Sequence, residues 1–274
     1  MNWFEGIVYG IVSGVSAFLP VSTKAHQMIV RNVMGMEQQP LLDIFICIGL
    51  LMSLLIACRP TFSKLHRERL KSMRRVRGRP AAADTRSLLD IRLVKTAAIS
   101  MIIGTILLLF VLPEQFGLHW VAIILIVNGV ILFVPEHMRH GNKDSRQMSR
   151  MDSFLMGMAG ALSILPGISR IGACMSAAVA RGAERHLALH WALLLSVPGI
   201  ALMMSANVLD LVRIGFGAVD FAAVLIYLLS MAAAFVAGYF SVRLMRLLVL
   251  QADGAGFAYY SWGAALFAFI LYLI

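Results

Sequence analysis

The stretch GVSAFLPVSTKAH, at residues 14–26, has a proline in the middle of an apolar segment. The apolar run Trp3 to Leu19 ends at Pro20, and the next run, residues 21–35, is short and contains Lys24. Proline breaks the hydrogen-bond ladder of a helix, and a helix needs about 20 apolar residues to cross a bilayer. Because irregular backbone at membrane depth is tolerated only when it is buried in protein or lines a wet cavity, we expect a re-entrant helical hairpin here.

A second region has the same pattern. The apolar run Asp152 to Leu165 ends at Pro166, and the short run that follows, residues 167–180, contains Arg170. When the two regions are aligned with an offset of 146 residues, each has a Leu-Pro pair followed, after two residues, by a hydroxyl residue and a cation. We therefore expect a second re-entrant hairpin and an internal repeat.

The composition excludes a soluble domain. Hydrophobic residues make up 60% of the chain and charged residues 14%, against roughly 45–50% and about 25% in soluble proteins. A formal net charge of +10 would suggest nucleic acid in a soluble protein, but twelve of the 24 Lys and Arg lie between Arg59 and Lys95. A cytoplasmic loop near anionic lipid explains such a cluster better than a nucleic-acid interface does.

Six further apolar runs are about long enough to span a membrane. They lie at residues 41–58, 93–113, 120–135, 187–211, 218–238 and 257–274. Lys and Arg concentrate in the loops 59–92 and 139–150, which the positive-inside rule places in the cytoplasm. The C-terminus then lies outside, and the two hairpins open to opposite sides of the membrane.

The predicted fold is an all-α polytopic membrane protein with six transmembrane helices and two re-entrant hairpins in an inverted repeat. We expect one membrane domain, residues 1–274, with repeat one at about 1–113, repeat two at about 150–240 and the basic cytoplasmic loop at 59–92. Inverted repeats with broken helices that meet near the midplane are typical of many transporters.

Ionisable groups inside membrane segments are costly and usually mark a functional site. Lys24 and Arg170 occupy matching positions of the repeat, each directly after a hydroxyl residue and near an expected helix start. The N–H groups at a helix start, beside a hydroxyl and a cation, bind anions, so we expect a phosphate or pyrophosphate between the hairpins. The predicted phosphate-binding residues are Ser22, Thr23, Lys24, His26, Gly167, Ser169 and Arg170.

Each candidate also has a simpler interpretation. Lys24 could extend to the membrane interface, and Arg170 could neutralise a buried acid such as Asp43. His26 could be a hydrogen-bonded core residue. The hydroxyl residues could simply cap helices, namely Ser22, Thr23 and Ser169. The matching hydroxyl and cation pairs in both repeats favour the functional interpretation.

Three segments resemble signature motifs of the bacterial undecaprenyl-pyrophosphate phosphatase family, also called the bacitracin-resistance family. They are GVSAFLPVSTKAH at residues 14–26, LPGISRIGAC at 165–174 and WALLLSVP at 191–198. The resemblance covers nearly the whole chain in length, order of spans and repeat. It implies a helical bundle with six spans and two re-entrant hairpins, and a polyprenyl carrier lipid as ligand. It also implies that the protein lies in a bacterial plasma (inner) membrane.

The chain departs from this family where hydrolysis would take place. In the family the first hairpin carries two glutamates, four residues apart, which hydrolysis needs and which are associated with a divalent metal. Ser13 and Ala17 occupy these positions here, and neither can act as a carboxylate ligand or a general base. We therefore expect no metal, and we expect Lys24 to supply positive charge that a metal would have given. The second motif, whose arginine and serine hold phosphate in the family, keeps Ser169 and Arg170.

Three functions remain open at this point, and one of them is a role in binding or sensing the lipid alone. The first is binding of a polyprenyl phosphate or pyrophosphate and translocation of its headgroup across the membrane in carrier-lipid recycling, without a cofactor. The alternative is an undecaprenyl-diphosphatase with a rearranged site in which His26 acts as nucleophile or base, and only this alternative would call for a divalent metal. The expected partners are the polyprenyl lipid and membrane lipids, without nucleic acid. A homodimer is left open, because glycine spacing alone is too weak a signal.

Overall fold

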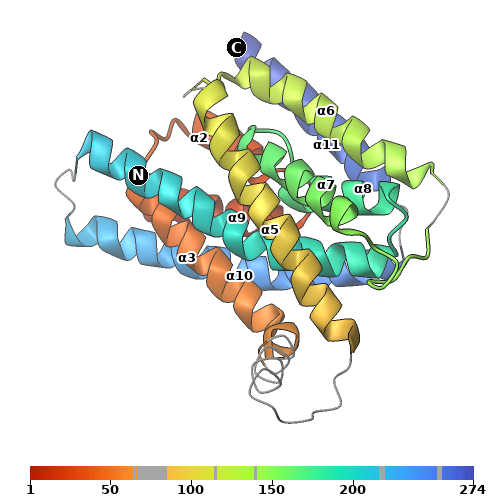
Figure 1. Ribbon diagram of the computed structural model, residues 1–274. Coiled ribbons are helices and arrows are strands. Elements are labelled where there is room, and N and C mark those ends of the chain that lie inside the picture. Colours follow the sequence, from red (N-terminus) through yellow and green to blue (C-terminus); the bar gives the residue numbers. More distant parts are fainter. Residues whose placement is uncertain (64–65, 67–84, 114–115, 139–140, 216–219, 252–254) are drawn as a thin grey trace.

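Figure 1 shows the computed structural model of the chain, in which every named element of the described part is a helix. The structure describes residues 1–63, 66, 85–113, 116–138, 141–215, 220–251 and 255–274. Most of the predicted basic loop 59–92, and the first two residues of the basic loop 139–150, lie outside the described residues.

Six described helices are long and apolar enough to cross a membrane, which confirms the number of spans. They are α3 (Pro40–Ala57), α5 (Thr85–Val111), α6 (Leu118–Glu136), α9 (Arg185–Ile214), α10 (Phe221–Gln251) and α11 (Ala255–Leu273). Large apolar side chains such as Ile103, Leu107 and Phe110 on α5 are exposed. Exposed apolar surface of this extent is typical of helices that face lipid, and the chain is a multi-pass membrane protein.

Several spans are longer than the sequence predicts, and α10 extends farthest past its expected end. Helix α10 continues to Gln251, past the expected end at residue 238. The helix accommodates Arg246, because the guanidinium of this residue donates to the Ala57 carbonyl at the end of α3, at 3.1 Å. Because this hydrogen bond satisfies the Arg246 side chain, the helix continues past the charged residue.

Four shorter helices form two consecutive pairs. The first pair is α1 (Trp3–Phe18) and α2 (Thr23–Met34), and the second is α7 (Arg150–Ala161) and α8 (Arg170–Ala180), with the short 3-10 helix η1 (Leu162–Ile164) after α7. Both breaks fall at a Leu-Pro pair, as predicted. At 11 to 16 residues these helices are shorter than a bilayer crossing requires.

The first helix of each pair packs against a long helix from the other half of the chain. Helix α1 packs along α10, and α7 packs along α5. Helices α3 and α9 contact each other, and α6 and α11 form a further pair that lies side by side at the top of Figure 1. The two short pairs are thereby held on either side of α3 and α9, with their breaks directed toward each other.

Glycine makes the contact between α1 and α10 close. Gly6, Gly10 and Gly14 lie four residues apart on α1 and face α10, and a Cβ atom at Gly14 would lie 2.6 Å from the Ala234 carbonyl oxygen. The contact between α7 and α5 uses the same device, because a Cβ atom at Gly104 would lie 2.9 Å from the Ala161 Cβ. Small residues at this spacing let membrane helices approach closely, and here they serve packing within one chain.

Candidate functional site

The two helix breaks touch each other directly. The Ser22 hydroxyl in the first break accepts a hydrogen bond from the Gly167 N–H in the second, at 3.1 Å. In the reverse direction, the Ser169 hydroxyl donates to the Leu19 carbonyl at 3.3 Å. We call this contact the elbow contact. It satisfies backbone groups that the helix breaks leave without intrahelical partners.

Asn128 of α6 joins the elbow contact from the side. Its carboxamide accepts from the Ser169 N–H at 2.9 Å, and its Nδ2 donates to the Ser261 hydroxyl at 2.9 Å and to the Pro20 carbonyl at 3.4 Å. The residue is fully buried. A buried amide must be hydrogen-bonded, so Asn128 fixes the relative position of the two breaks. Sequence reasoning missed it, although it is the one amide side chain in the run 120–135.

A cavity with a volume of ≈ 90 Å³ lies beside the elbow contact. We call it the elbow cavity. Its walls come from the four short helices next to the two breaks, from the second break itself and from the spans α3, α5 and α9. The lining residues are Ala17, Thr23, Lys24, Leu50, Met101, Thr105, Leu109, Gly160, Ser163, Ile164, Ile168, Ser169, Arg170, Gly199, Leu202, Met203 and Ala206.

Lys24 and Arg170 reach this one cavity from the two short helix pairs, α1 with α2 and α7 with α8, which we call the first and the second hairpin and which are far apart in the sequence. The Lys24 ammonium donates to the Ile164 carbonyl in the second break, at 3.1 Å. Lys24 is the second residue of α2, and Arg170 is the first residue of α8. No Asp or Glu is among the described residues that line the cavity. Two cations near two helix starts, without an acid on the cavity wall, favour an anionic ligand.

The segment WALLLSVP, at residues 191–198, and the glycine after it contact the Arg170 side chain. The Arg170 Nε–H donates to the Ser196 hydroxyl on α9, at a long 3.5 Å. A Cβ atom at Gly199 would lie 2.5 Å from Arg170 Cδ, so the absence of a side chain there makes room for the arginine. Ser196 lies within the motif WALLLSVP and Gly199 directly follows it. The motif therefore positions the arginine of the second hairpin.

Comparison with known proteins agrees with this architecture. The family model of the bacitracin resistance protein BacA matches residues 6–267. The chain belongs to the BacA family. It is 30% identical over 266 residues to the undecaprenyl-diphosphatase of Carboxydothermus hydrogenoformans, covering 96% of this chain and 94% of that protein. It is also 30% identical to a protein of the same name from Methanobrevibacter smithii, over 98% of each chain, and 28% identical to one from Treponema denticola, over 97% of this chain and all of that protein.

Six of the seven residues predicted to bind phosphate divide into two groups, and His26 belongs to neither. Thr23, Lys24, Ser169 and Arg170 line the elbow cavity. Ser22 and Gly167 do not line it and instead hydrogen-bond to each other. This second group holds the breaks together.

His26 lies away from the elbow cavity. Its Nδ1 is 2.8 Å from the Ser22 carbonyl oxygen, and its Nε2 is 2.7 Å from the Tyr260 hydroxyl on α11. The two rings stack, with centroids 5.6 Å apart. Because both ring nitrogens are engaged and Tyr260 covers one of them, the geometry gives the predicted catalytic role of His26 no support.

The positions of the two BacA-family glutamates differ in their surroundings. Ala17 lines the elbow cavity. Ser13 is fully buried, and its hydroxyl accepts from the Gln27 Nε2 at 3.0 Å. The described residues contain no group of three or more His, Cys, Asp or Glu that could hold a metal ion. A serine and an alanine beside Lys24 are a poor donor set for a divalent cation, so the residues present do not fit the metal that the resemblance implies.

Asp43 has other partners than the sequence suggested. It pairs with Arg31 of α2, and it accepts from the Tyr9 hydroxyl at 2.6 Å. The Arg31 guanidinium also lies over the Tyr9 ring, 5.0 Å from its centroid. The interpretation that Arg170 neutralises Asp43 is therefore wrong, because Arg31 already does so.

Proposed function

We propose that the elbow cavity binds the phosphate end of a polyprenyl phosphate or diphosphate. The observation that carries this proposal is the convergence of Lys24 and Arg170 on one cavity whose described walls hold no carboxylate. The Thr23 and Ser169 hydroxyls line the same cavity and can donate to phosphate oxygens. The class of lipid comes from the relatives, which are named undecaprenyl-diphosphatase.

Two reactions can follow binding, and the relatives' names favour hydrolysis over translocation. In a phosphatase, Lys24 and Arg170 would stabilise the negative charge that develops on the transferring phosphoryl group. A base or nucleophile would have to come from outside the cavity wall, or His26 would have to leave Tyr260. A phosphatase activity of this chain would thus work differently from one with paired glutamates.

Translocation of the headgroup is the second candidate. Ser13 and Ala17 remove the carboxylates that hydrolysis uses in the family, while the cations that hold an anion are present. The exchanged packing of α1 on α10 and of α7 on α5 is what an inverted repeat with two re-entrant hairpins would produce. We also propose that the protein lies in a bacterial plasma membrane, with its basic loops in the cytoplasm, where the positive-inside rule places them, and its C-terminus outside.

One preparation tests both reactions. Purified protein in liposomes is given undecaprenyl diphosphate, and phosphate release and headgroup crossing are measured with Mg²⁺ and with a chelator. Phosphate release that disappears in Arg170→Ala but persists in Arg181→Ala, whose arginine lies outside the cavity, supports hydrolysis. Headgroup crossing without phosphate release, with the same dependence on Arg170, supports translocation.

A gain-of-function variant separates the candidates further. Ser13→Glu combined with Ala17→Glu restores the family carboxylates, and we expect it to gain metal-dependent phosphate release if their loss is what limits hydrolysis. If the parent chain and this variant neither release phosphate nor move the headgroup, and neither binds the lipid, the proposed function is wrong.

A further inference from the structure

A second cavity lies on the other side of the elbow contact. It has a volume of ≈ 50 Å³ and is lined by Pro20 of the first break and Gly172 of α8. The elbow cavity is lined instead by Thr23 and Arg170 of these same segments. The breaks and the start of α8 thus form a wall between the two cavities. We call the second one the Arg185 cavity.

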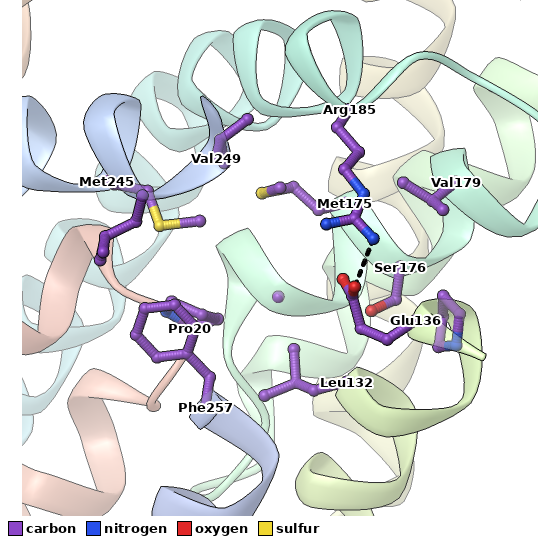
Figure 2. A pocket seen from close by; sticks show the side chains of 13 residues that line it. Pro20, Leu132, Glu136, Met175, Ser176, Val179, Arg185, Met245, Val249 and Phe257 are labelled. Carbon is purple, nitrogen blue, oxygen red and sulfur yellow. Dashed lines mark hydrogen bonds and ion pairs between the residues drawn. The ribbon is translucent and has the colours of Figure 1, made fainter. Parts of the chain in front are cut away.

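An ion pair and an apolar wall face each other across the Arg185 cavity. Arg185 of α9 pairs with Glu136 of α6, and Figure 2 shows Met245 and Phe257 opposite them. The side chains of Arg185 and Glu136 are 25% and 16% exposed. The Ser176 hydroxyl of α8 also lines this cavity. A polar side with an arginine and a hydroxyl, opposite an apolar side, has the layout of a site for a lipid phosphate.

Both charges of this pair stand at the unfavourable ends of their helices. Arg185 is the first residue of α9, and Glu136 is the last residue of α6. A helix start carries partial positive charge and a helix end partial negative charge, so the positive potential of α9 adds to that of Arg185. The Glu136 carboxylate offsets this potential, but it gains nothing from its own helix. A phosphate of higher charge would satisfy the same arginine better.

The elbow cavity has a matching arrangement, because its Arg170 is the first residue of α8. We propose that the Arg185 cavity is a second phosphate site, which takes the headgroup of the same polyprenyl phosphate on the other side of the elbow contact. The phosphate replaces the Glu136 carboxylate on the Arg185 guanidinium, and the isoprenoid chain lies against Met245 and Phe257. Methionine side chains are adaptable enough to widen the cavity. This site rests on the proposed binding of a polyprenyl phosphate in the elbow cavity.

Ligand protection of an introduced thiol tests the second site. Ser176→Cys places a thiol in the Arg185 cavity, and Thr105→Cys places one in the elbow cavity as its control. The parent chain gives the background, because its own cysteines are buried. The probe is farnesyl phosphate in detergent, at ten times its dissociation constant for the cavity that is tested. Where the probe covers the thiol, mass action predicts that a thiol reagent modifies it about tenfold more slowly.

Variants of the ion pair show whether Arg185 holds the phosphate. In the Ser176→Cys chain, Glu136→Gln removes the competing carboxylate and lowers the probe concentration needed for protection. Glu136→Gln with Arg185→Gln keeps a neutral pair of similar shape and abolishes protection. Protection of Thr105→Cys is unchanged by either set of substitutions.

The outcomes separate this inference from the proposed function. Protection of Thr105→Cys without protection of Ser176→Cys overturns the second site and leaves the first standing. Absence of protection at both positions overturns the proposed function and the inference with it. Protection of Ser176→Cys that survives the double glutamine change shows that Arg185 is not the receptor and overturns the proposal. Equal protection by inorganic phosphate alone shows a site for free phosphate rather than for a lipid, and also overturns it.

Discussion

The two short helix pairs share a Leu-Pro break but begin their second helices differently. In the second pair, Ser169 caps α8, because its hydroxyl accepts from the Gly172 N–H at 3.2 Å. In the first pair, Ser22 precedes α2 with a φ of 66° and makes no side-chain cap, and its hydroxyl serves Gly167 across the elbow contact. The serine of the second hairpin thus accepts from an N–H at the start of its own helix, whereas the serine of the first hairpin accepts from an N–H of the other hairpin.

This difference changes what each hairpin offers a ligand. The start of α8 is partly occupied by the Ser169 hydroxyl, so Arg170 is the chief group there that the proposed phosphate would contact. The start of α2 has no side-chain cap, so its N–H groups can add to Lys24. On the proposed function, the same short motif would therefore offer phosphate side-chain groups in the second hairpin, and both side-chain and backbone groups in the first.

The open ends of the hairpins differ as well. At the first hairpin, Arg31 of α2 pairs with Asp43 of the following span α3, and the two side chains are 15% and 8% exposed. In the second, Asp152 is 3% exposed, but its partner Arg181 is 47% exposed, with a distance of 2.6 Å between Nε and Oδ1. Water can solvate Arg181 when its partner is lost, and Arg31 has much less access to water. The comparison predicts unequal costs when the two pairs are broken.

Asp43→Asn should give the largest effect. It leaves the Arg31 charge mostly buried without its counter-ion, and breaking a buried pair from one side costs about 3–5 kcal/mol. Thermal unfolding of the purified protein in detergent measures the loss. The double change Arg31→Met with Asp43→Leu removes both charges and should recover most of the stability. A single variant as stable as the parent would show that the first hairpin is not held by this pair.

Arg170→Ala should weaken binding of farnesyl phosphate more than Lys24→Ala does. A hydrogen bond to a charged group contributes about 1.5–3 kcal/mol, which corresponds to roughly 10- to 150-fold in affinity. Lys24 acts as a point charge, and the uncapped start of α2 continues to bind phosphate without it. Titration calorimetry measures both variants, with Arg181→Ala as the control outside the cavity. The reverse order of effects would contradict the contrast drawn between the hairpins.

The smallest effect concerns acid stability of the second hairpin. Burial raises the pKa of the Asp152 carboxyl, but hydrogen bonds from the Ser149 N–H and from Arg181 lower it by a larger amount. The net shift of this pKa is therefore downward. A lowered folded-state pKa stabilises the protein above the unfolded-state pKa, and the contribution is lost as the pH falls through the folded-state value.

Asp152→Asn should therefore lower the melting temperature slightly at neutral pH and reduce the further drop between about pH 5 and pH 3. The measurement is the melting temperature of parent and variant across this range. Arg181→Gln should behave similarly if Arg181 lowers the pKa of Asp152. An unchanged pH dependence in Asp152→Asn would show that another group titrates there.

Much of the fold follows from local properties of the sequence. The six spans and the two breaks could be predicted because apolar length and proline act over a single segment. The repeat of a Leu-Pro pair with a hydroxyl and a cation also led to Lys24 and Arg170, which line one cavity. Family membership was equally readable from short motifs.

Other features depended on contacts between distant segments. The sequence gives no sign that Asn128 lies against both breaks, that His26 turns to Tyr260, or that Arg31 pairs with Asp43. Each of these hydrogen bonds joins different helices or helix breaks, from 12 residues apart in the chain for Arg31 and Asp43 to 234 for His26 and Tyr260, and only their packing brings donor and acceptor together. Residue types and spacing thus determined which helices form and which groups are unusual in a membrane, and tertiary packing alone decided which of those groups face a cavity and which satisfy one another.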